Sequence, residues 1–151
     1  MLEPDHDFYR NHKNCFSKYV TFSGRASRSE FWYFMLFCLL GSTILSLFDG
    51  FVLGMSAIQP ASSVFGLVTF LPSICVTTRR LHDGNRRGWW QLIWLAPIPV
   101  FLAAYGLKAH SLMIVGVIAM IACVVMLLAW LITKGSEGDN RFGSNPLAAD
   151  A

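Results

Sequence analysis

Residues 111–133 read SLMIVGVIAMIACVVMLLAWLIT and contain no charged side chain. The hydrocarbon core of a bilayer is crossed by a helix of about 20 apolar residues, and this stretch reaches that length. In lipid, the backbone polar groups of such a segment must be satisfied within the segment itself, as they are in a helix. The stretch therefore predicts a transmembrane helix.

Three further stretches lack charge in the same way, and each is long enough to hold a transmembrane helix. Together with the first stretch they give four expected spans, at residues 31–48, 61–78, 89–105 and 111–133. Pro97 and Pro99 predict that the third span bends or starts late, because proline removes backbone hydrogen bonds. The predicted fold class is all-α, a polytopic membrane protein with a four-transmembrane-helix bundle.

The composition of the chain agrees with a membrane protein. Of its 151 residues, 54% are hydrophobic and only 14% are charged. Soluble domains carry about 25% charged residues, so this surface is not that of an ordinary globular protein in water. The high apolar content also excludes a disordered chain.

The basic residues are distributed unequally between the two sides of the predicted spans. With four crossings, 11 of the 12 lysines and arginines fall on one side, and Lys108 falls on the other. Basic loops favour the cytoplasmic side, so we expect both termini in the cytoplasm. The chain then divides into a cytoplasmic N-terminal segment at 1–29, a transmembrane domain at 30–133 with a cytoplasmic loop at 79–88, and a cytoplasmic tail at 134–151.

The N-terminal segment carries a helical pattern. Between Asp5 and Val20, one face is formed near every fourth position by Phe8, His12, Phe16 and Tyr19. This spacing predicts a short interfacial amphipathic helix in the headgroup region, with its cations facing anionic lipid. The alternative is a partly ordered tail with scattered aromatic residues.

Charged and polar residues cluster in the three segments predicted to be cytoplasmic. Ser27-Arg28-Ser29-Glu30 fits the S-x-x-E capping box, so Ser27 is expected to cap the first span and Glu30 to reach back to it. Arginine side chains suit phosphate and carboxylate groups. We therefore expect these segments to form a polar cap that binds anionic lipid headgroups or a partner protein. The polar cap comprises Arg25, Arg28, Glu30, Arg79, Arg80, His82, Asp83 and Arg141.

Pairing within the polar cap is also predicted. Arg141 and Asp139 are expected to pair with Asp83 and with the arginines of the 79–88 loop, which would join the three segments. The alternative for this loop is an ordinary positive-inside loop, with Asp83 as a local partner of its neighbours.

No catalytic, cofactor or metal site is predicted. One histidine beside one aspartate supplies too few ligands for zinc, which takes three or four from the protein. Nothing resembles a phosphate-binding glycine loop or a nucleophile elbow, and the basic stretches are too short to favour nucleic acid. We expect a non-enzymatic protein without a cofactor, whose partners are membrane lipids, with a protein partner or a homo-oligomer left open. The alternatives are a small transporter or channel, oligomeric or not, and a membrane enzyme that uses His82 and Asp83.

Three motifs occur in order around the four spans. They are Phe22-Ser23-Gly24-Arg25 with Arg28, Glu30, Phe31 and Trp32; Arg79-Arg80-Leu81-His82-Asp83 with Gly88-Trp89-Trp90; and Asn140-Arg141-Phe142-Gly143 with Asn145-Pro146. Over roughly residues 16–146 the chain resembles the bacterial inner-membrane proteins known as domain of unknown function 805. The family typically has a Thr-Gly turn where this chain has Gly84-Asn85. The resemblance implies a small multi-pass protein of the bacterial inner (plasma) membrane with no established activity.

Overall fold

The computed structural model describes residues 20–54 and 59–146. Within these ranges every regular element is helical, and four segments are long and apolar enough to cross a membrane. This result confirms the all-α, four-span fold class. Apart from Val20, the predicted N-terminal amphipathic helix lies outside the described residues.

The four spans are made of five helical elements. They are α2 (Arg28–Leu53), α3 (Pro60–Asp83), the 3-10 helix η1 (Gly88–Leu95), α4 (Ile98–Gly106) and α5 (His110–Ile132). The third span consists of η1 and α4 with a break between them. The break occurs at Ala96 and Pro97, where the sequence predicts a bend or a late start, because proline cannot donate a backbone hydrogen bond.

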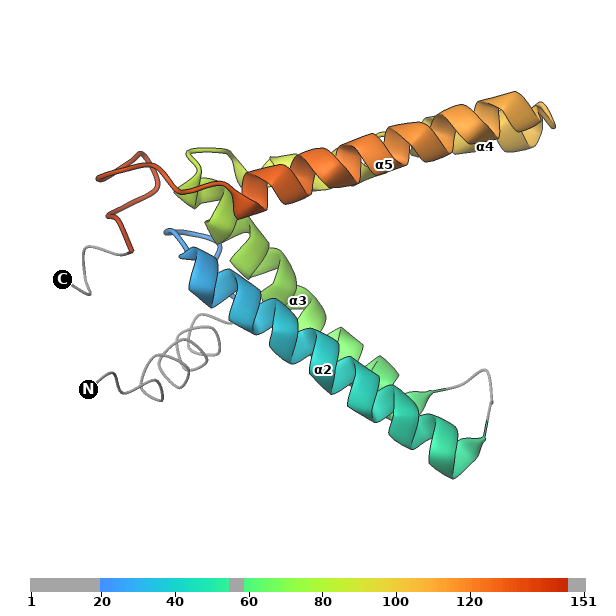
Figure 1. Cartoon of the computed structure of the whole chain (residues 1–151), viewed down its shortest axis with the longest axis horizontal. Coiled ribbons are helices and arrows are strands. Elements are labelled where there is room, and N and C mark those ends of the chain that lie inside the picture. Colours follow the sequence, from blue (N-terminus) through green and yellow to red (C-terminus); the bar gives the residue numbers. More distant parts are fainter. Residues whose placement is uncertain (1–19, 55–58, 147–151) are drawn as a thin grey trace.

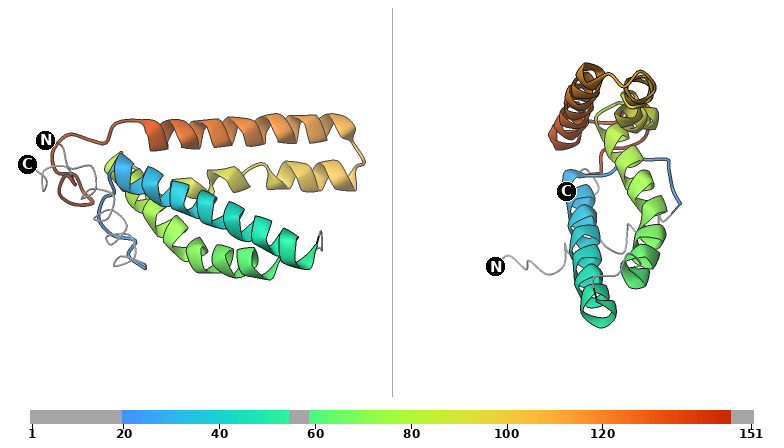
Figure 2. Two further views of the ribbon diagram at one scale, coloured as in Figure 1. Left: turned by 60° about the horizontal axis from the view of Figure 1, so that its bottom comes forward. Right: turned by 90° about the vertical axis from the view of Figure 1, so that its right-hand side faces the viewer.

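The spans form two helical hairpins that diverge from a shared end (Figure 1). In one hairpin α2 packs along α3, and in the other α4 packs along α5. The hairpins are joined where η1 contacts both α3 and α5. The left view of Figure 2 shows that the start of α2 and the segment after α5 lie at this same end. We call it the arginine-rich end.

Large apolar side chains are exposed over most of the helical surface. Phe51 is 91% exposed, Leu67 76% and Ile114 62%. An apolar surface of this extent is unfavourable in water, whereas lipid tails are as apolar as the side chains themselves. The exposed helix faces therefore agree with the four membrane spans.

Helix α3 continues beyond its predicted end at Thr78. It runs to Asp83, so residues 79–83 project from the last helical turns rather than from a loop. Residues 79–83 of the predicted 79–88 loop are therefore helical, and a turn over 84–87 leads into η1. The cytoplasmic position of this segment stays a prediction. The helix persists because its charged side chains are paired within the fold, as described below.

The start of α3 is capped by a side chain of α2. Gln59 occupies the N-cap position but makes no side-chain capping bond. Instead, Asp49 Oδ1 accepts from Ala61 N at 3.2 Å, and Oδ2 accepts from Ser62 N at 2.9 Å. The Ser62 hydroxyl donates to the same Oδ2 at 3.1 Å. A carboxylate at this position satisfies free backbone N–H groups and interacts favourably with the helix dipole.

Candidate functional site

Asp83, the last residue of α3, binds two arginine side chains at once. Its Oδ1 accepts from Arg25 Nε at 3.0 Å and from Arg25 Nη2 at 2.8 Å, and its Oδ2 accepts from Arg80 Nη1. Both arginine side chains are 1% exposed and the Asp83 side chain is 6% exposed. Hydrogen bonds between charged groups are shorter and stronger than neutral ones. Without Asp83, two buried cations would lose their counterion.

Arg80 also connects α3 to the end of α5. Its Nε donates to the carbonyl oxygen of Leu131 at 2.9 Å, and its Nη2 donates to that of Thr133. The last carbonyls of a helix have no partner within the helix, and a cation there is favoured by the helix dipole. Arg80 therefore caps α5 while it neutralises Asp83.

Arg25 makes a similar connection to the segment that follows α5. Its Nη1 donates to the Gly138 carbonyl at 2.6 Å, and its Nη2 donates to the Ser136 carbonyl at 2.7 Å. Ser136 in turn donates from its backbone N at 2.8 Å and from its hydroxyl at 3.1 Å to the backbone carbonyl of Asp83. One network thus joins the segment before α2, the end of α3 and the segment after α5.

A second ion pair attaches the first turn of α2 to α3. Glu30 Oε1 accepts from Arg79 Nη1 at 2.6 Å, and Arg79 is 1% exposed. The backbone N of Ala26 donates to the Arg79 carbonyl at 3.1 Å. Ser27 caps α2 as predicted, since its hydroxyl accepts from Glu30 N at 3.2 Å. The Glu30 side chain binds Arg79, and its predicted return to the cap stays a prediction.

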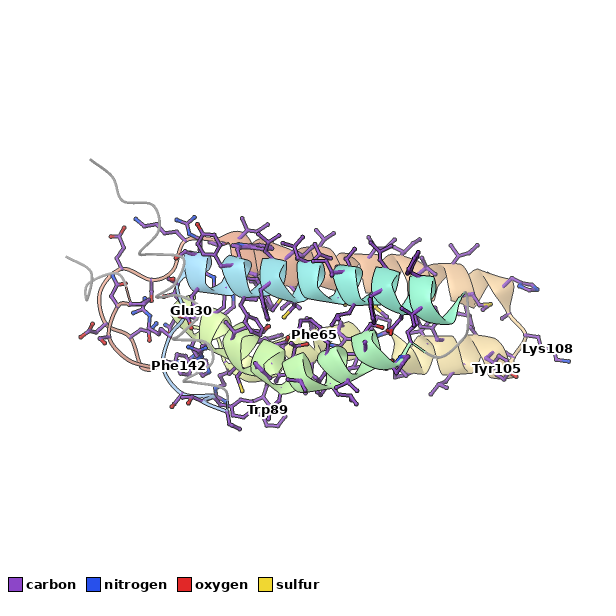
Figure 3. The ribbon with its side chains drawn as sticks, turned by 90° about the horizontal axis from the view of Figure 1, so that it is seen from below. Glu30, Phe65, Trp89, Tyr105, Lys108 and Phe142 are labelled. Carbon is purple, nitrogen blue, oxygen red and sulfur yellow. The ribbon has the colours of Figure 1, made fainter. Side chains whose placement is uncertain are left out.

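His82 contacts the backbone of one segment and an aromatic ring of another. Its Nδ1 lies 3.1 Å from the Gly24 carbonyl oxygen, and its ring stacks on Phe142 with the centroids 3.9 Å apart. Asn140 Nδ2 donates to the His82 carbonyl at 2.9 Å. Figure 3 shows Glu30 and Phe142 at the arginine-rich end, far from Lys108 at the other end.

The structure divides the eight predicted residues of the polar cap into two groups. Arg28 and Arg141 are exposed. The other six are buried and belong to the connections just described: Arg25, Glu30, Arg79, Arg80, His82 and Asp83. Arg25, Arg79, Arg80 and His82 each make a contact that joins one segment of the chain to another. This group therefore acts as a joint between the segments.

The predicted pairing of Arg141 and Asp139 with the rest of the polar cap is wrong. Arg141 Nη2 donates to the Asn85 carbonyl at 2.8 Å, and Asp139 Oδ1 accepts from Asn145 N at 3.2 Å. The position next to Asp83 is taken by Arg25.

Residues that the sequence analysis did not select complete the joint. Ser136, Gly138 and Asn140 supply acceptors or donors to it. Gly135 lies so close to Asp83 that a Cβ atom there would be 2.0 Å from Asp83 Oδ2. The signal in the sequence is the density of glycine, serine and asparagine after α5, residues that are typical of turns.

The exposed part of the arginine-rich end is the part available to a ligand. Arg28 and Arg87 form no ion pair with any described residue. Lys134 pairs with Glu137 at 2.8 Å, but both side chains are largely exposed, and such pairs contribute little. Among residues 20–54 and 59–146, no group of three or more metal-ligating side chains occurs.

Comparisons with known proteins give one matching family and related inner membrane proteins of two names, YhaI and YhaH. A family model described as "Protein of unknown function (DUF805)" matches residues 19–144. Inner membrane protein YhaI of Escherichia coli (strain K12) is 32% identical over 128 residues, which are 85% of this chain and 87% of that protein. Inner membrane protein YhaH of the same strain is 32% identical over 130 residues, which are 85% of this chain and 88% of that protein. No solved structure matches.

Proposed function

The chain belongs to the DUF805 family of proteins of unknown function, and from this membership we propose that it is a non-enzymatic inner-membrane protein whose arginine-rich end binds anionic lipid headgroups. We also propose that this end and both termini face the cytoplasm, because basic residues favour that side. The observation that carries the proposal is a surplus of positive charge. Among the described residues of this end, eight arginines and lysines face four carboxylates.

Most of this surplus of positive charge lies outside the buried joint. Two of the four carboxylates, Glu30 and Asp83, are held by buried arginines. They therefore cannot neutralise Arg28, Arg87 and Arg141, which are exposed. A basic group near the surface of an anionic leaflet contributes about 1 kcal/mol of attraction. We therefore propose that the exposed arginines bind lipid and that the buried arginines have a structural role.

Exposed tryptophans also support the proposal that the arginine-rich end binds lipid headgroups. Trp89 and Trp90 follow the turn over 84–87 and are 79% and 49% exposed, and Trp32 in the first turns of α2 is 42% exposed. Tryptophan is enriched at the level of the headgroups. The exposed arginines would therefore lie at the depth where they can reach lipid phosphates.

The lipid preference tests this proposal. Tryptophan fluorescence of the reconstituted protein is quenched by brominated lipids that contact it, so quenching measures the relative affinity for each lipid. We expect the wild type to prefer brominated phosphatidylglycerol over brominated phosphatidylcholine. The combined variant Arg28→Gln, Arg87→Gln and Arg141→Gln is expected to lose roughly 100-fold of that preference, because each of the three cations contributes about 1 kcal/mol.

Lys108→Gln is the matched control, since it removes a cation at the opposite end. It should keep the preference of the wild type for lipid at the arginine-rich end. An equal affinity of the wild-type protein for both lipids would overturn the proposal. So would solute-specific uptake into the proteoliposomes, which would indicate a transporter.

The proposed orientation has a test of its own. A reporter enzyme that is active only in the periplasm, fused to the C-terminus of the full chain, is expected to stay inactive, because four spans return the chain to its starting side. The same reporter inserted at Lys108 should be active. An active C-terminal fusion would contradict the orientation and remove the exposed arginines from the cytoplasmic leaflet.

A further inference from the structure

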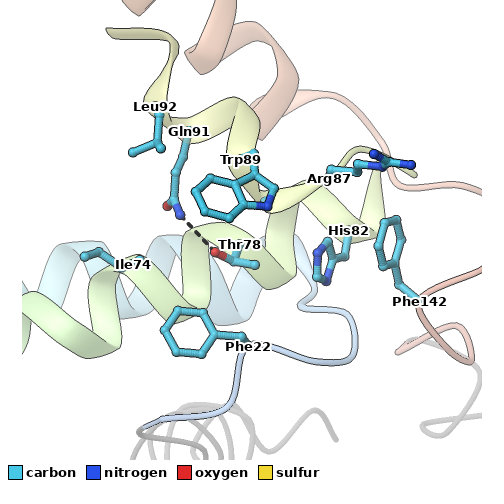
Figure 4. A pocket seen from close by; sticks show the side chains of 10 residues that line it. Phe22, Ile74, Thr78, His82, Arg87, Trp89, Gln91, Leu92 and Phe142 are labelled. Atoms are coloured by element: carbon cyan, nitrogen blue, oxygen red, sulfur yellow. Dashed lines mark hydrogen bonds between the residues drawn. The ribbon is translucent and has the colours of Figure 1, made fainter. Parts of the chain in front are cut away.

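A pocket of about 740 Å³ lies beside the buried joint, between α3 and η1 (Figure 4). Ligand pockets usually have volumes of about 300–1,000 Å³, with mostly apolar walls and a few placed polar groups. This pocket has that character. Its apolar walls are provided by Phe22, Ile74, Trp89, Leu92 and Phe142.

The polar groups of the pocket come from the facing sides of α3 and η1 and from the turn between them. They are Thr78, His82, Arg87 and Gln91. Gln91 Nε2 donates to Thr78 Oγ1 at 3.0 Å (Figure 4), which holds η1 against α3. This bond uses a donor of the Gln91 amide and leaves its carbonyl oxygen as an acceptor.

The His82 ring is oriented so that one nitrogen is available. A carbonyl oxygen only accepts hydrogen bonds, so the contact at 3.1 Å to the Gly24 oxygen requires the proton on Nδ1. In the neutral ring Nε2 then carries a lone pair. The residue is only 9% exposed, and within the described part of the chain no group donates to Nε2. His82 thus offers the pocket an unused acceptor.

Arg87 adds a positive charge at the same pocket. Its side chain forms no hydrogen bond or ion pair with a described residue, and no carboxylate lines the pocket. A guanidinium group binds a phosphate oxygen pair through two parallel N–H donors. The pocket therefore combines an apolar wall, a free cation and unused acceptors.

We propose that this pocket binds one molecule of an anionic phospholipid whose headgroup carries hydroxyl groups. Arg87 pairs with the phosphodiester, His82 Nε2 accepts a hydrogen bond from a headgroup hydroxyl, and an acyl chain lies against Ile74 and Leu92. The inference rests on the proposed binding of anionic lipid and narrows it to one site and one kind of headgroup.

The position of the pocket favours a lipid over a water-soluble ligand. Three of its apolar wall residues, Ile74, Trp89 and Leu92, belong to α3 and η1, both parts of membrane spans, whereas Phe22 and Phe142 come from the segments before α2 and after α5. Its charged residue, Arg87, belongs to the turn at the arginine-rich end. An amphiphile with an anionic head and an apolar chain matches this order of charged and apolar groups, whereas a free phosphate ester would leave the apolar walls uncovered.

Two lipids that differ only in the headgroup hydroxyls give the sharpest test. Phosphatidylglycerol and phosphatidylethanol have the same charge and the same phosphodiester, but phosphatidylethanol has no hydroxyl. Native mass spectrometry of the full chain in detergent counts the lipids bound and measures their affinity. We expect one phosphatidylglycerol to bind about fivefold more tightly than phosphatidylethanol, the value of about one neutral hydrogen bond.

Adjacent arginines give the matched variants. Arg87→Gln is expected to weaken the one-to-one complex with phosphatidylglycerol about tenfold, because a charged hydrogen bond is lost. Arg86→Gln should leave it unchanged, since the Arg86 side chain lies over the Trp130 ring, 4.8 Å from its centroid, and does not line the pocket. Neither variant alters the buried joint.

The possible results distinguish the pocket proposal from the broader proposal of anionic lipid binding. Equal affinity for the two lipids, or equal weakening by Arg86→Gln and Arg87→Gln, would overturn the pocket proposal. If quenching by brominated phosphatidylglycerol still shows a preference for anionic lipid, the broader proposal stands without the pocket. A wild-type protein that shows neither the complex nor the preference would overturn both.

Discussion

The variant Asp83→Asn is expected to lower the free energy of unfolding by about 3–5 kcal/mol, the typical cost of breaking a buried ion pair by removing one partner. Asparagine keeps the size of the side chain but removes the charge that Arg25 and Arg80 share. Both guanidinium groups would remain buried at the junction of three segments without a counterion. Few other single substitutions in this chain are expected to lower the free energy of unfolding by as much.

Unfolding of the purified protein in mixed micelles, followed by tryptophan fluorescence, measures this difference. Asp139→Asn is the matched control, because it makes the same chemical change at an exposed carboxylate. That control should change the free energy of unfolding by no more than about 0.5 kcal/mol. If Asp83→Asn unfolds at the same denaturant concentration as the control, the buried joint does not stabilise the fold.

The variant Gly135→Ala is expected to destabilise the protein by about 1–3 kcal/mol, as overpacking of a close contact does. The added methyl group would lie 2.0 Å from Asp83 Oδ2 and 2.5 Å from its carboxylate carbon. Asp83 cannot retreat, because both of its oxygens hold arginines. The segment after α5 must therefore move, and the 2.8 Å bond from Ser136 N to the Asp83 carbonyl is lost.

Gly66→Ala is the control for this substitution. Nothing lies within 4 Å of a Cβ atom at Gly66, and alanine is favoured over glycine inside a helix by up to about 1 kcal/mol. The same unfolding measurement should therefore show a neutral or stabilised protein for Gly66→Ala. A stability for Gly135→Ala equal to that of the wild type would mean that the tail does not rest on Asp83.

The spans could be predicted from the sequence because each one follows from the local absence of charge. The break in the third span was equally visible, since Pro97 acts on its own backbone. The length of α3 was not predictable in this way. Arg79, Arg80 and Asp83 are charges that would end a span in lipid, and they remain helical because Glu30 and Arg25 come from another part of the chain.

For the polar cap, the residue types pointed to the right segments but not to the partners. Arg25 and Arg141 are equally plausible partners for Asp83 when only charge is considered. The choice depends on where the segments before α2 and after α5 run, which is a property of the packed hairpins. Backbone carbonyls such as those of Leu131 and Gly138 carry no sequence signal, so their bonds to arginine were not predictable.

The carboxylate of Asp49 at the start of α3 has a consequence for biogenesis. Because the amide groups of Ala61 and Ser62 have an acceptor that belongs to α2, the first turn of the second span gains this cap, worth about 0.5–2 kcal/mol, only when the first span lies beside it. The first two spans, α2 and α3, are therefore expected to enter the bilayer together as a helical hairpin rather than as single helices.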